Sequence, residues 1–201
     1  MTNLSHMPPI RDQLGRALRD LRISVMDRCN FRCVYCMPED KFHPGFKFLP
    51  SKARLSFDEM LRLVRIFTKL GVSKIRITGG EPLLRVNLTD FIGDLSTIDK
   101  IKDIALTTNG VLLKKYADEL KAAGLDRITV SLDSIDPNEF RLMTGGRGDL
   151  NQVLNGIDGA QRAGFKDIKI NAVIKKGVNE SNILKMVEYF RDQPVILRFI
   201  E

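Results

Sequence analysis

The sequence predicts an α/β fold in which six parallel strands alternate with helices and form a wide or incomplete barrel. The first observation is the alternation itself: six short apolar segments are separated by helical segments, a pattern typical of a parallel sheet. The second is that several strands alternate apolar and polar residues, so one face of the sheet is polar. A doubly wound sheet favours near-continuous apolar strands, and a closed eight-stranded barrel fills its interior with aliphatic side chains. A wet or ligand-filled interior is therefore expected, although alternation alone does not fix the strand order.

The elements follow one another at regular spacing. Strands are expected over residues 21–26, 74–78, 103–107, 127–131, 168–173 and 195–200. Helices are expected over residues 56–70, 88–98, 112–123, 150–163 and 181–191, with a short one opening at residue 136. Ser56 and Glu59 form a capping-box pattern at the start of the first helix, and Gly71 is expected to end it. Residues 1–20 are expected to form a partly helical arm, and residues 21–201 the barrel domain.

The composition limits the cellular setting and the class of ligand. The chain has 201 residues, 43% of them hydrophobic, and a formal net charge of +7. No apolar run approaches the roughly 18 residues that cross a bilayer, and the first residues lack the apolar segment of a signal peptide. We therefore expect a cytoplasmic protein, in which clustered cysteines bind metal or catalyse. The basic balance suits anionic ligands, and a solvated surface is the plainer alternative.

The polar faces of the predicted strands carry cations. Four of them would converge on one interior: Arg22, Lys74, Arg76 and Lys169. Because unpaired buried cations cost several kcal/mol each, this cluster predicts an anionic ligand, and Arg and Lys both suit phosphate. The alternative is internal pairing with Asp103, Asp126 or Asp167.

All three cysteines of the chain directly follow the first strand. Cys29, Cys33 and Cys36 are spaced with three and then two intervening residues. A disulfide would leave one cysteine over and would close a very short loop. A structural zinc site needs four ligands, and the nearby fourth candidate is His43. Iron–sulfur chemistry is favoured, because three thiolates can hold three irons of a cubane and leave the fourth for a small molecule.

A glycine turn follows the second strand. Gly79 and Gly80 allow the backbone to come close to a ligand, and Glu81 adds an acceptor for an amine or hydroxyl. Such a sequence is also found in ordinary turns. Its place at the carboxyl end of a strand, beside the cysteine loop, favours a ligand site.

These motifs together resemble the radical S-adenosylmethionine (radical SAM) superfamily, and most closely its GTP 3′,8-cyclase family of molybdenum cofactor biosynthesis. The resemblance rests on residues 20–25, 29–38, 74–85, 107–110 and 127–133, in the family's order. It implies an incomplete (βα)6 TIM-like barrel and a lyase. It also implies one 4Fe–4S cluster, with S-adenosylmethionine on the open iron as the source of a 5′-deoxyadenosyl radical. That radical would abstract hydrogen from the ribose of GTP and start closure to 3′,8-cyclo-7,8-dihydro-GTP.

The resemblance also assigns residues to roles. The cluster ligands are Cys29, Cys33 and Cys36. The implied cofactor contacts are Tyr35, Gly79, Gly80, Glu81 and Ser131. The implied GTP contacts are Arg22, Lys74, Arg76, Thr107 and Lys169.

The chain departs from the family at its C-terminal side. Family members are longer and carry three further cysteines for a second cluster, and this chain has no further cysteine. A fragment and a naturally short relative both fit, and we expect this chain alone to be incomplete for the GTP reaction. An external electron donor is implied, and an exposed last strand favours pairing in a homodimer; neither nucleic acid nor a membrane is expected as a partner. Two alternatives stay open: another radical SAM enzyme, for example one acting on a peptide, and a non-catalytic module that binds nucleotide or a partner.

Overall fold

The computed structural model describes residues 10–200, and within them six parallel strands form one sheet. The strands are β1 (Asp20–Ser24), β2 (Lys74–Thr78), β3 (Asp103–Thr108), β4 (Arg127–Ser131), β5 (Ile168–Val173) and β6 (Val195–Ile200). Their order in the sheet is their order in the chain, and every neighbouring pair is parallel. β1 and β6 are the two edges, so the described sheet is an open barrel, as predicted.

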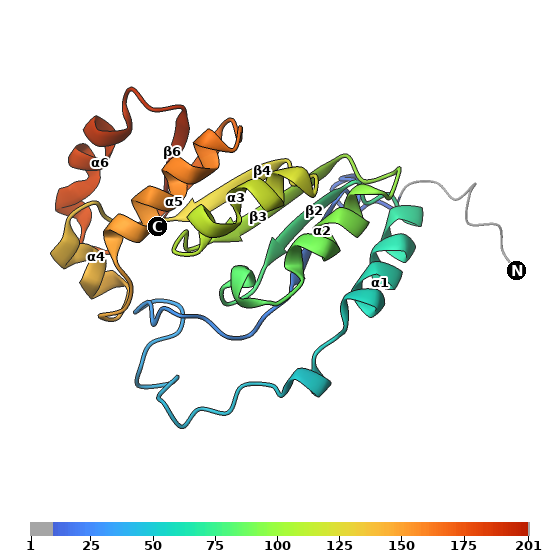
Figure 1. Ribbon diagram of the computed structural model, residues 1–201, viewed down its shortest axis with the longest axis horizontal. Helices are drawn as coiled ribbons and strands as arrows, with labels where there is room; N and C mark the ends of the chain where they lie inside the picture. The colour runs from blue at the N-terminus through green and yellow to red at the C-terminus, as the bar shows by residue number, and fades with distance from the viewer. Residues whose placement is uncertain (1–9, 201) are drawn as a thin grey trace, which may run out of the picture.

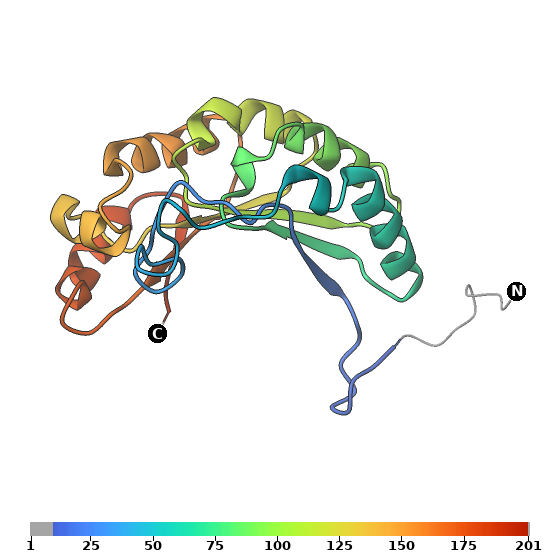
Figure 2. The same ribbon diagram turned by 90° about the horizontal axis from the view of Figure 1, so that it is seen from below.

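The helices cover one side of this sheet. They are α1 (Phe57–Lys69), α2 (Leu88–Ser96), α3 (Leu113–Ala122), α4 (Pro137–Met143), α5 (Leu150–Arg162) and α6 (Ile183–Phe190). Figure 1 shows them along the sheet, and Figure 2 shows the sheet curved into an arch with most helices on its outer side. The inner, concave side is the predicted interior.

The predicted strand faces are confirmed. Ile75 and Ile77 of β2 are at most 1% exposed, whereas the alternating residues Lys74 and Arg76 are exposed. In β5, Ile168, Ile170 and Ala172 are buried and the intervening residues are not. The apolar core therefore lies between the sheet and the helices, and the polar side chains line the concave face.

The start of α1 illustrates how local sequence sets an element. The Glu59 backbone N–H donates to the Ser56 hydroxyl at 3.2 Å, and the Ser56 N–H donates to the Glu59 carboxylate at 2.7 Å. This is the predicted capping box. Gly71 follows the helix with φ +111°, a conformation that glycine adopts without strain.

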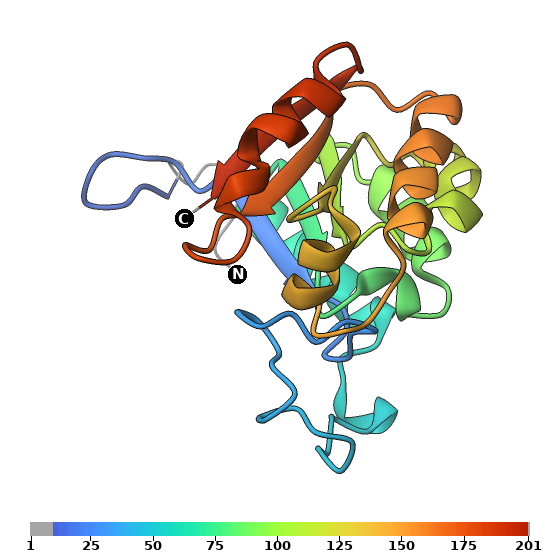
Figure 3. The same cartoon turned by 90° about the vertical axis from the view of Figure 1, so that its left-hand side faces the viewer.

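The prediction of a partly helical arm is wrong for residues 10–19; residues 1–9 lie outside the described range. Arg11 and Ala17 form an antiparallel bridge instead. The Asp12 carboxylate accepts hydrogen bonds from the N–H groups of Leu14 and Arg16, which favours a turn over a helix. Figures 2 and 3 show this turn projecting away from the sheet. Among residues 10–200, no helix combines the length and apolarity needed to span a bilayer.

Candidate functional site

The cysteine loop runs along the carboxyl end of the sheet, from β1 toward α4 (Figure 1). The Arg32 N–H donates to the Thr144 carbonyl and the Val34 N–H to the Met143 carbonyl, each at 3.1 Å. These bonds attach the loop to the end of α4. Gly145 is required at this contact, because a Cβ there would lie within 3.0 Å of the Arg32 carbonyl oxygen and its φ is +67°.

Arg32 fixes the shape of the loop from inside. Arg32 is 8% exposed, and its guanidinium group donates to the carbonyls of Cys29 at 2.9 Å, Phe31 at 2.8 Å and Phe42 at 3.0 Å. A buried cation that satisfies three carbonyls holds the backbone between the first two cysteines and the following loop. The family motif contains this arginine, but only the structure shows what it does.

The three cysteine side chains fit a cluster better than a disulfide. All are free thiols; Cys29 and Cys33 are half-buried and Cys36 is exposed. Burial raises the pKa of Cys33 to about 12 and also raises that of Cys29, and the neighbouring thiols add to both shifts. Such thiols become thiolates only when a metal replaces the proton. Among residues 10–200, no three ligating side chains converge on one ion, and a four-iron cluster takes each thiolate on a different iron.

Tyr35 connects the cysteine loop to the carboxyl ends of β4 and β5. Its hydroxyl donates to the Asp133 carboxylate at 2.9 Å, and the Val173 N–H donates to the other carboxylate oxygen at 2.9 Å. Burial raises the pKa of Tyr35, and the negative charge of Asp133 raises it further. The phenol is therefore a neutral hydrogen-bond donor at physiological pH.

The glycine turn after β2 packs against the start of the cysteine loop. A Cβ on Gly79 would lie 2.5 Å from the Met26 carbonyl oxygen, and one on Gly80 within 3.0 Å of the Arg28 carbonyl oxygen. The N–H groups of Gly80 and Glu81 donate to these two carbonyls at 2.6 and 2.8 Å. The glycines thus permit a close backbone approach to the cysteine loop, and their predicted contact with a ligand stays a prediction.

The buried carboxylate of Glu81 forms hydrogen bonds within the protein. It is 1% exposed, and its carboxylate accepts hydrogen bonds from the Thr108 hydroxyl at 2.8 Å, the Asn109 N–H at 2.7 Å and the Leu83 N–H at 3.0 Å. Burial raises its pKa, against these hydrogen bonds. These contacts join the glycine turn to the end of β3, and a contact of Glu81 with the cofactor stays a prediction.

The predicted cations lie on the concave face. Arg22 and Arg76 are register partners on β1 and β2, and both are exposed there. Thr107 of β3 is the register partner of Thr129 on β4, and Thr129 is in turn the register partner of Lys169 on β5. Lys74 differs, because its ammonium group lies 3.9 Å from the Asp103 carboxylate.

The alternative of internal pairing therefore holds for one cation of the four. Asp103 also pairs with Arg127, so it shares its charge between two cations. Within residues 10–200 no carboxylate lies within ion-pair distance of Arg22, Arg76 or Lys169. The concave face keeps an unbalanced positive charge.

The comparisons with known proteins identify the fold family. The model of the Radical SAM superfamily matches residues 23–190.

The chain belongs to the radical SAM superfamily.

Its sequence is 53% identical over 193 residues to the GTP 3′,8-cyclase of Xanthomonas axonopodis pv. citri, covering 96% of this chain and 58% of that protein. It is 52% identical over 192 residues to the GTP 3′,8-cyclase of Staphylococcus aureus strain Mu50, covering 96% and 56%. The chain thus spans a little over half the length of these curated relatives.

Solved structures confirm the fold. The structure of Streptococcus suis SuiB bound to S-adenosylmethionine matches with a TM-score of 0.69 at 22% identity, over 90% of this chain and 38% of that one. Methylornithine synthase matches with a TM-score of 0.68 at 15% identity, over 92% and 54%. Radical SAM membership brings a 4Fe–4S cluster and S-adenosylmethionine as cofactors, and the three thiols of the cysteine loop suit that cluster.

Ser131 ends β4, and its contact with the cofactor stays a prediction. Its register partner on β5 is Asn171, which in turn faces Arg198 of β6. The Asn171 Oδ1 atom is buried and has no hydrogen-bond partner in the described part of the chain, residues 10–200. Because buried acceptors are normally satisfied, this position fits a ligand with a hydroxyl or amine group.

Sequence reasoning assigned no site role to four residues that the structure places beside the predicted ones: Asn109, Asp133, Asn171 and Arg198. Asn109 donates to the Asn30 side chain at 2.7 Å and lies 3.9 Å from the Cys29 sulfur. A usable signal existed for all four, since each stands on the polar face or at the carboxyl end of a predicted strand.

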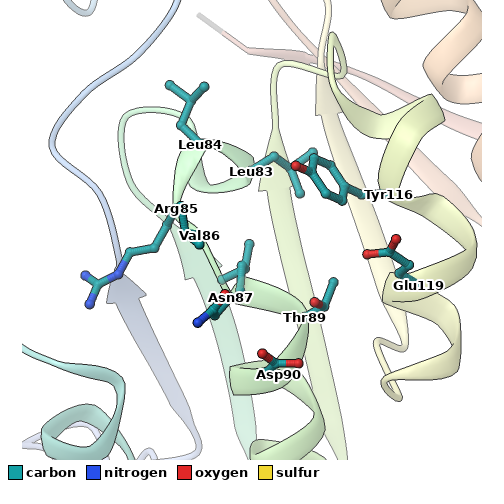
Figure 4. A pocket seen from close by; sticks show the side chains of 10 residues that line it. Leu83, Leu84, Arg85, Val86, Asn87, Thr89, Asp90, Tyr116 and Glu119 are labelled. Atoms are coloured by element: carbon teal, nitrogen blue, oxygen red, sulfur yellow. The ribbon is translucent and has the colours of Figure 1, made fainter.

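A cavity of about 280 Å3 lies outside the barrel, beside the start of α2 and next to α3 (Figure 4). It is lined by residues 83–90 together with Tyr116 and Glu119. Figure 4 shows the Arg85 guanidinium directed away from it, toward the end of β1, where it donates to the Val25 carbonyl at 2.7 Å. None of the residues predicted for the cofactor or GTP lines this cavity.

Proposed function

We propose that this chain is the barrel part of a radical SAM lyase that cyclises GTP to 3′,8-cyclo-7,8-dihydro-GTP in molybdenum cofactor biosynthesis. The similarity to GTP 3′,8-cyclases over 96% of the chain supports it. The observation that carries it is the pair Arg22 and Arg76, adjacent on the concave face with no carboxylate at ion-pair distance in the described part of the chain.

The cofactor end of the proposed site is the carboxyl end of the strands. Cys29, Cys33 and Cys36 would hold the cluster, and bound S-adenosylmethionine would supply a 5′-deoxyadenosyl radical. The chain's own residues orient that cofactor and exclude water. The proposed contacts are Tyr35 from the cysteine loop, Gly79, Gly80 and Glu81 from the turn after β2, and Ser131 from β4.

The substrate end lies deeper on the concave face. We assign the triphosphate of GTP to Arg22, Arg76, Thr107 and Lys169, because guanidinium and ammonium groups bind phosphate by charge-assisted hydrogen bonds. Lys74 belongs to the same cluster but already shares Asp103, so its contribution is smaller. Holding both ligands in one barrel places the ribose near the radical source.

Three further points belong to the proposal. An external donor supplies the electron for the cluster, the protein works in the cytoplasm, and β6 pairs with another chain, as in a homodimer. The last point follows from the edge position of β6, whose residues Ile196, Phe199 and Ile200 are exposed.

The test is GTP binding to the anaerobically reconstituted chain, measured by isothermal titration calorimetry. Arg76→Ala is expected to weaken binding about tenfold or more, because it removes a charge-assisted contact. Arg65→Ala is the matched control, since Arg65 is an exposed arginine on α1, outside the barrel. Equal affinities for the two variants would overturn the assignment of GTP to the concave face.

Incubation with dithionite and S-adenosylmethionine then separates the remaining alternatives. Release of 5′-deoxyadenosine without GTP binding would favour a different radical SAM substrate, such as a peptide. GTP binding without release of 5′-deoxyadenosine would favour a non-catalytic module.

A further inference from the structure

Asp133 stands outside the predicted cofactor and substrate contacts, yet it joins two distant parts of the site. Its carboxylate accepts the Tyr35 hydroxyl at 2.9 Å, across 98 residues of sequence. We propose that Asp133 is a positioning residue that holds Tyr35, and with it the turn between Cys33 and Cys36, in the geometry that receives the cluster. The proposal rests on the radical SAM assignment and not on GTP as the substrate.

Asp133 is built as a rigid anchor. It is 5% exposed, and its second carboxylate oxygen accepts the Val173 N–H at 2.9 Å. Its backbone carbonyl accepts the Asn179 side-chain amide at 2.8 Å, and the same amide donates to the Val173 carbonyl at 2.9 Å. Asn179 itself is fully buried. The carboxylate is therefore fixed to the ends of β4 and β5 and cannot swing toward solvent.

Tyr35 is held far less firmly by its own surroundings. The residue is 45% exposed and lies between half-buried Cys33 and exposed Cys36. The turn that carries it closes with two bonds to one acceptor, from the N–H groups of Cys36 and Met37 to the Cys33 carbonyl, each at 3.0 Å. A half-exposed side chain on such a turn has many rotamers available, and a hydrogen bond to a fixed carboxylate selects one of them.

The electrostatics of Asp133 also favour this contact. No Lys, Arg or His lies within ion-pair distance of Asp133 among residues 10–200. Its buried carboxylate is satisfied by the Val173 N–H and the Tyr35 hydroxyl alone. Removing the hydroxyl leaves one buried carboxylate oxygen without a partner, so the bond is more costly to lose than one at the surface.

The position of the bond indicates what it does for the site. Tyr35 lies between the proposed cluster ligands Cys33 and Cys36 in the sequence, on the turn that the Cys36 and Met37 N–H groups close at the Cys33 carbonyl. Groups that orient a metal ligand without binding the metal typically change metal affinity 10- to 100-fold. Asp133 acts through Tyr35 in this way on the second half of the cysteine motif.

The experiment compares Tyr35→Phe, Asp133→Ala and the double variant with the unchanged chain, because an asparagine at position 133 could still bond the Tyr35 hydroxyl. Tyr189→Phe is the matched control, because Tyr189 is equally exposed, on α6. The first readout is amide hydrogen exchange of residues 33–42 in the chain without iron. The second is the rate at which the reconstituted chain loses iron to a chelator.

Both single variants are expected to accelerate exchange and iron loss roughly tenfold, as for one hydrogen bond to a charged group. The double variant should add little, because both changes remove the same bond. Unchanged exchange in Tyr35→Phe, or fully additive effects, would overturn the proposal. If Asp133→Ala unfolds, Tyr35→Phe alone decides, since its ring and fold are retained. The exchange readout needs neither cluster nor GTP, so its failure is distinct from failure of the proposed function.

Discussion

The close packing of Gly80 on the cysteine loop leads to a quantitative prediction for Gly80→Ala. The added methyl group would lie within 3.0 Å of the Arg28 carbonyl oxygen, and near the Cys29 nitrogen as well. The two backbones must then separate. That weakens two hydrogen bonds, from the N–H groups of Gly80 and Glu81, each contributing about 1 kcal/mol. Overpacking adds about 1–3 kcal/mol, so we expect a loss of about 3–5 kcal/mol, a large part of the roughly 5–15 kcal/mol that stabilises a typical domain.

Urea denaturation of the chain without iron measures this loss, and Gly93→Ala is the control. Gly93 lies inside α2, and a Cβ there would meet nothing within 4 Å. Alanine at this position should stabilise the chain by up to about 1 kcal/mol, because glycine is a poor helix former. The reasoning is refuted if Gly80→Ala costs less than about 1 kcal/mol or behaves like Gly93→Ala. A large loss with an unchanged m-value would support a purely local clash.

Three further predictions concern the cap, the cations and the cysteines. Ser56→Ala should lower the free energy of unfolding by about 1 kcal/mol through loss of the capping box; an unchanged urea midpoint would show that the cap is dispensable. Arg76→Ala should weaken GTP binding more than Lys74→Ala, because Asp103 already pairs with Lys74; the reverse order in calorimetry would contradict this. Cys33→Ala should abolish reconstitution of a four-iron cluster, and iron analysis showing undiminished binding would exclude Cys33 as a ligand.

The strands could be predicted to the residue where alternation is strong. β2, β4 and β5 begin and end at the expected positions, because burial of every second residue is visible in the sequence. β6 also matches its expected bounds, although none of its residues is buried. The order of strands could not be predicted, since alternation fits several sheets. The turn at residues 10–19 was missed because hydrogen bonds from Asp12 compete with the helix.

The candidate site could also be predicted only in part: its contiguous motifs were visible in the sequence, and its long-range contacts were not. The cysteine loop and the glycine turn are contiguous motifs, so their spacing alone indicates their chemistry. Asp133 could not be predicted as a partner of Tyr35, because the two are 98 residues apart and meet only when the cysteine loop reaches the carboxyl end of β4. The pairing of Lys74 with Asp103 depends likewise on the register of β2 and β3.

The sequential strand order has a consequence for how the molecule assembles. Each strand pairs with the next one along the chain, so each βα unit can dock on its predecessor during synthesis. Contacts of this kind close short loops and form early. The bonds from the cysteine loop to Met143, Thr144 and Asp133 close loops of about a hundred residues. We therefore expect the scaffold to form first and the cysteine loop to lock last, so that an incompletely folded chain already has its sheet but not its iron site.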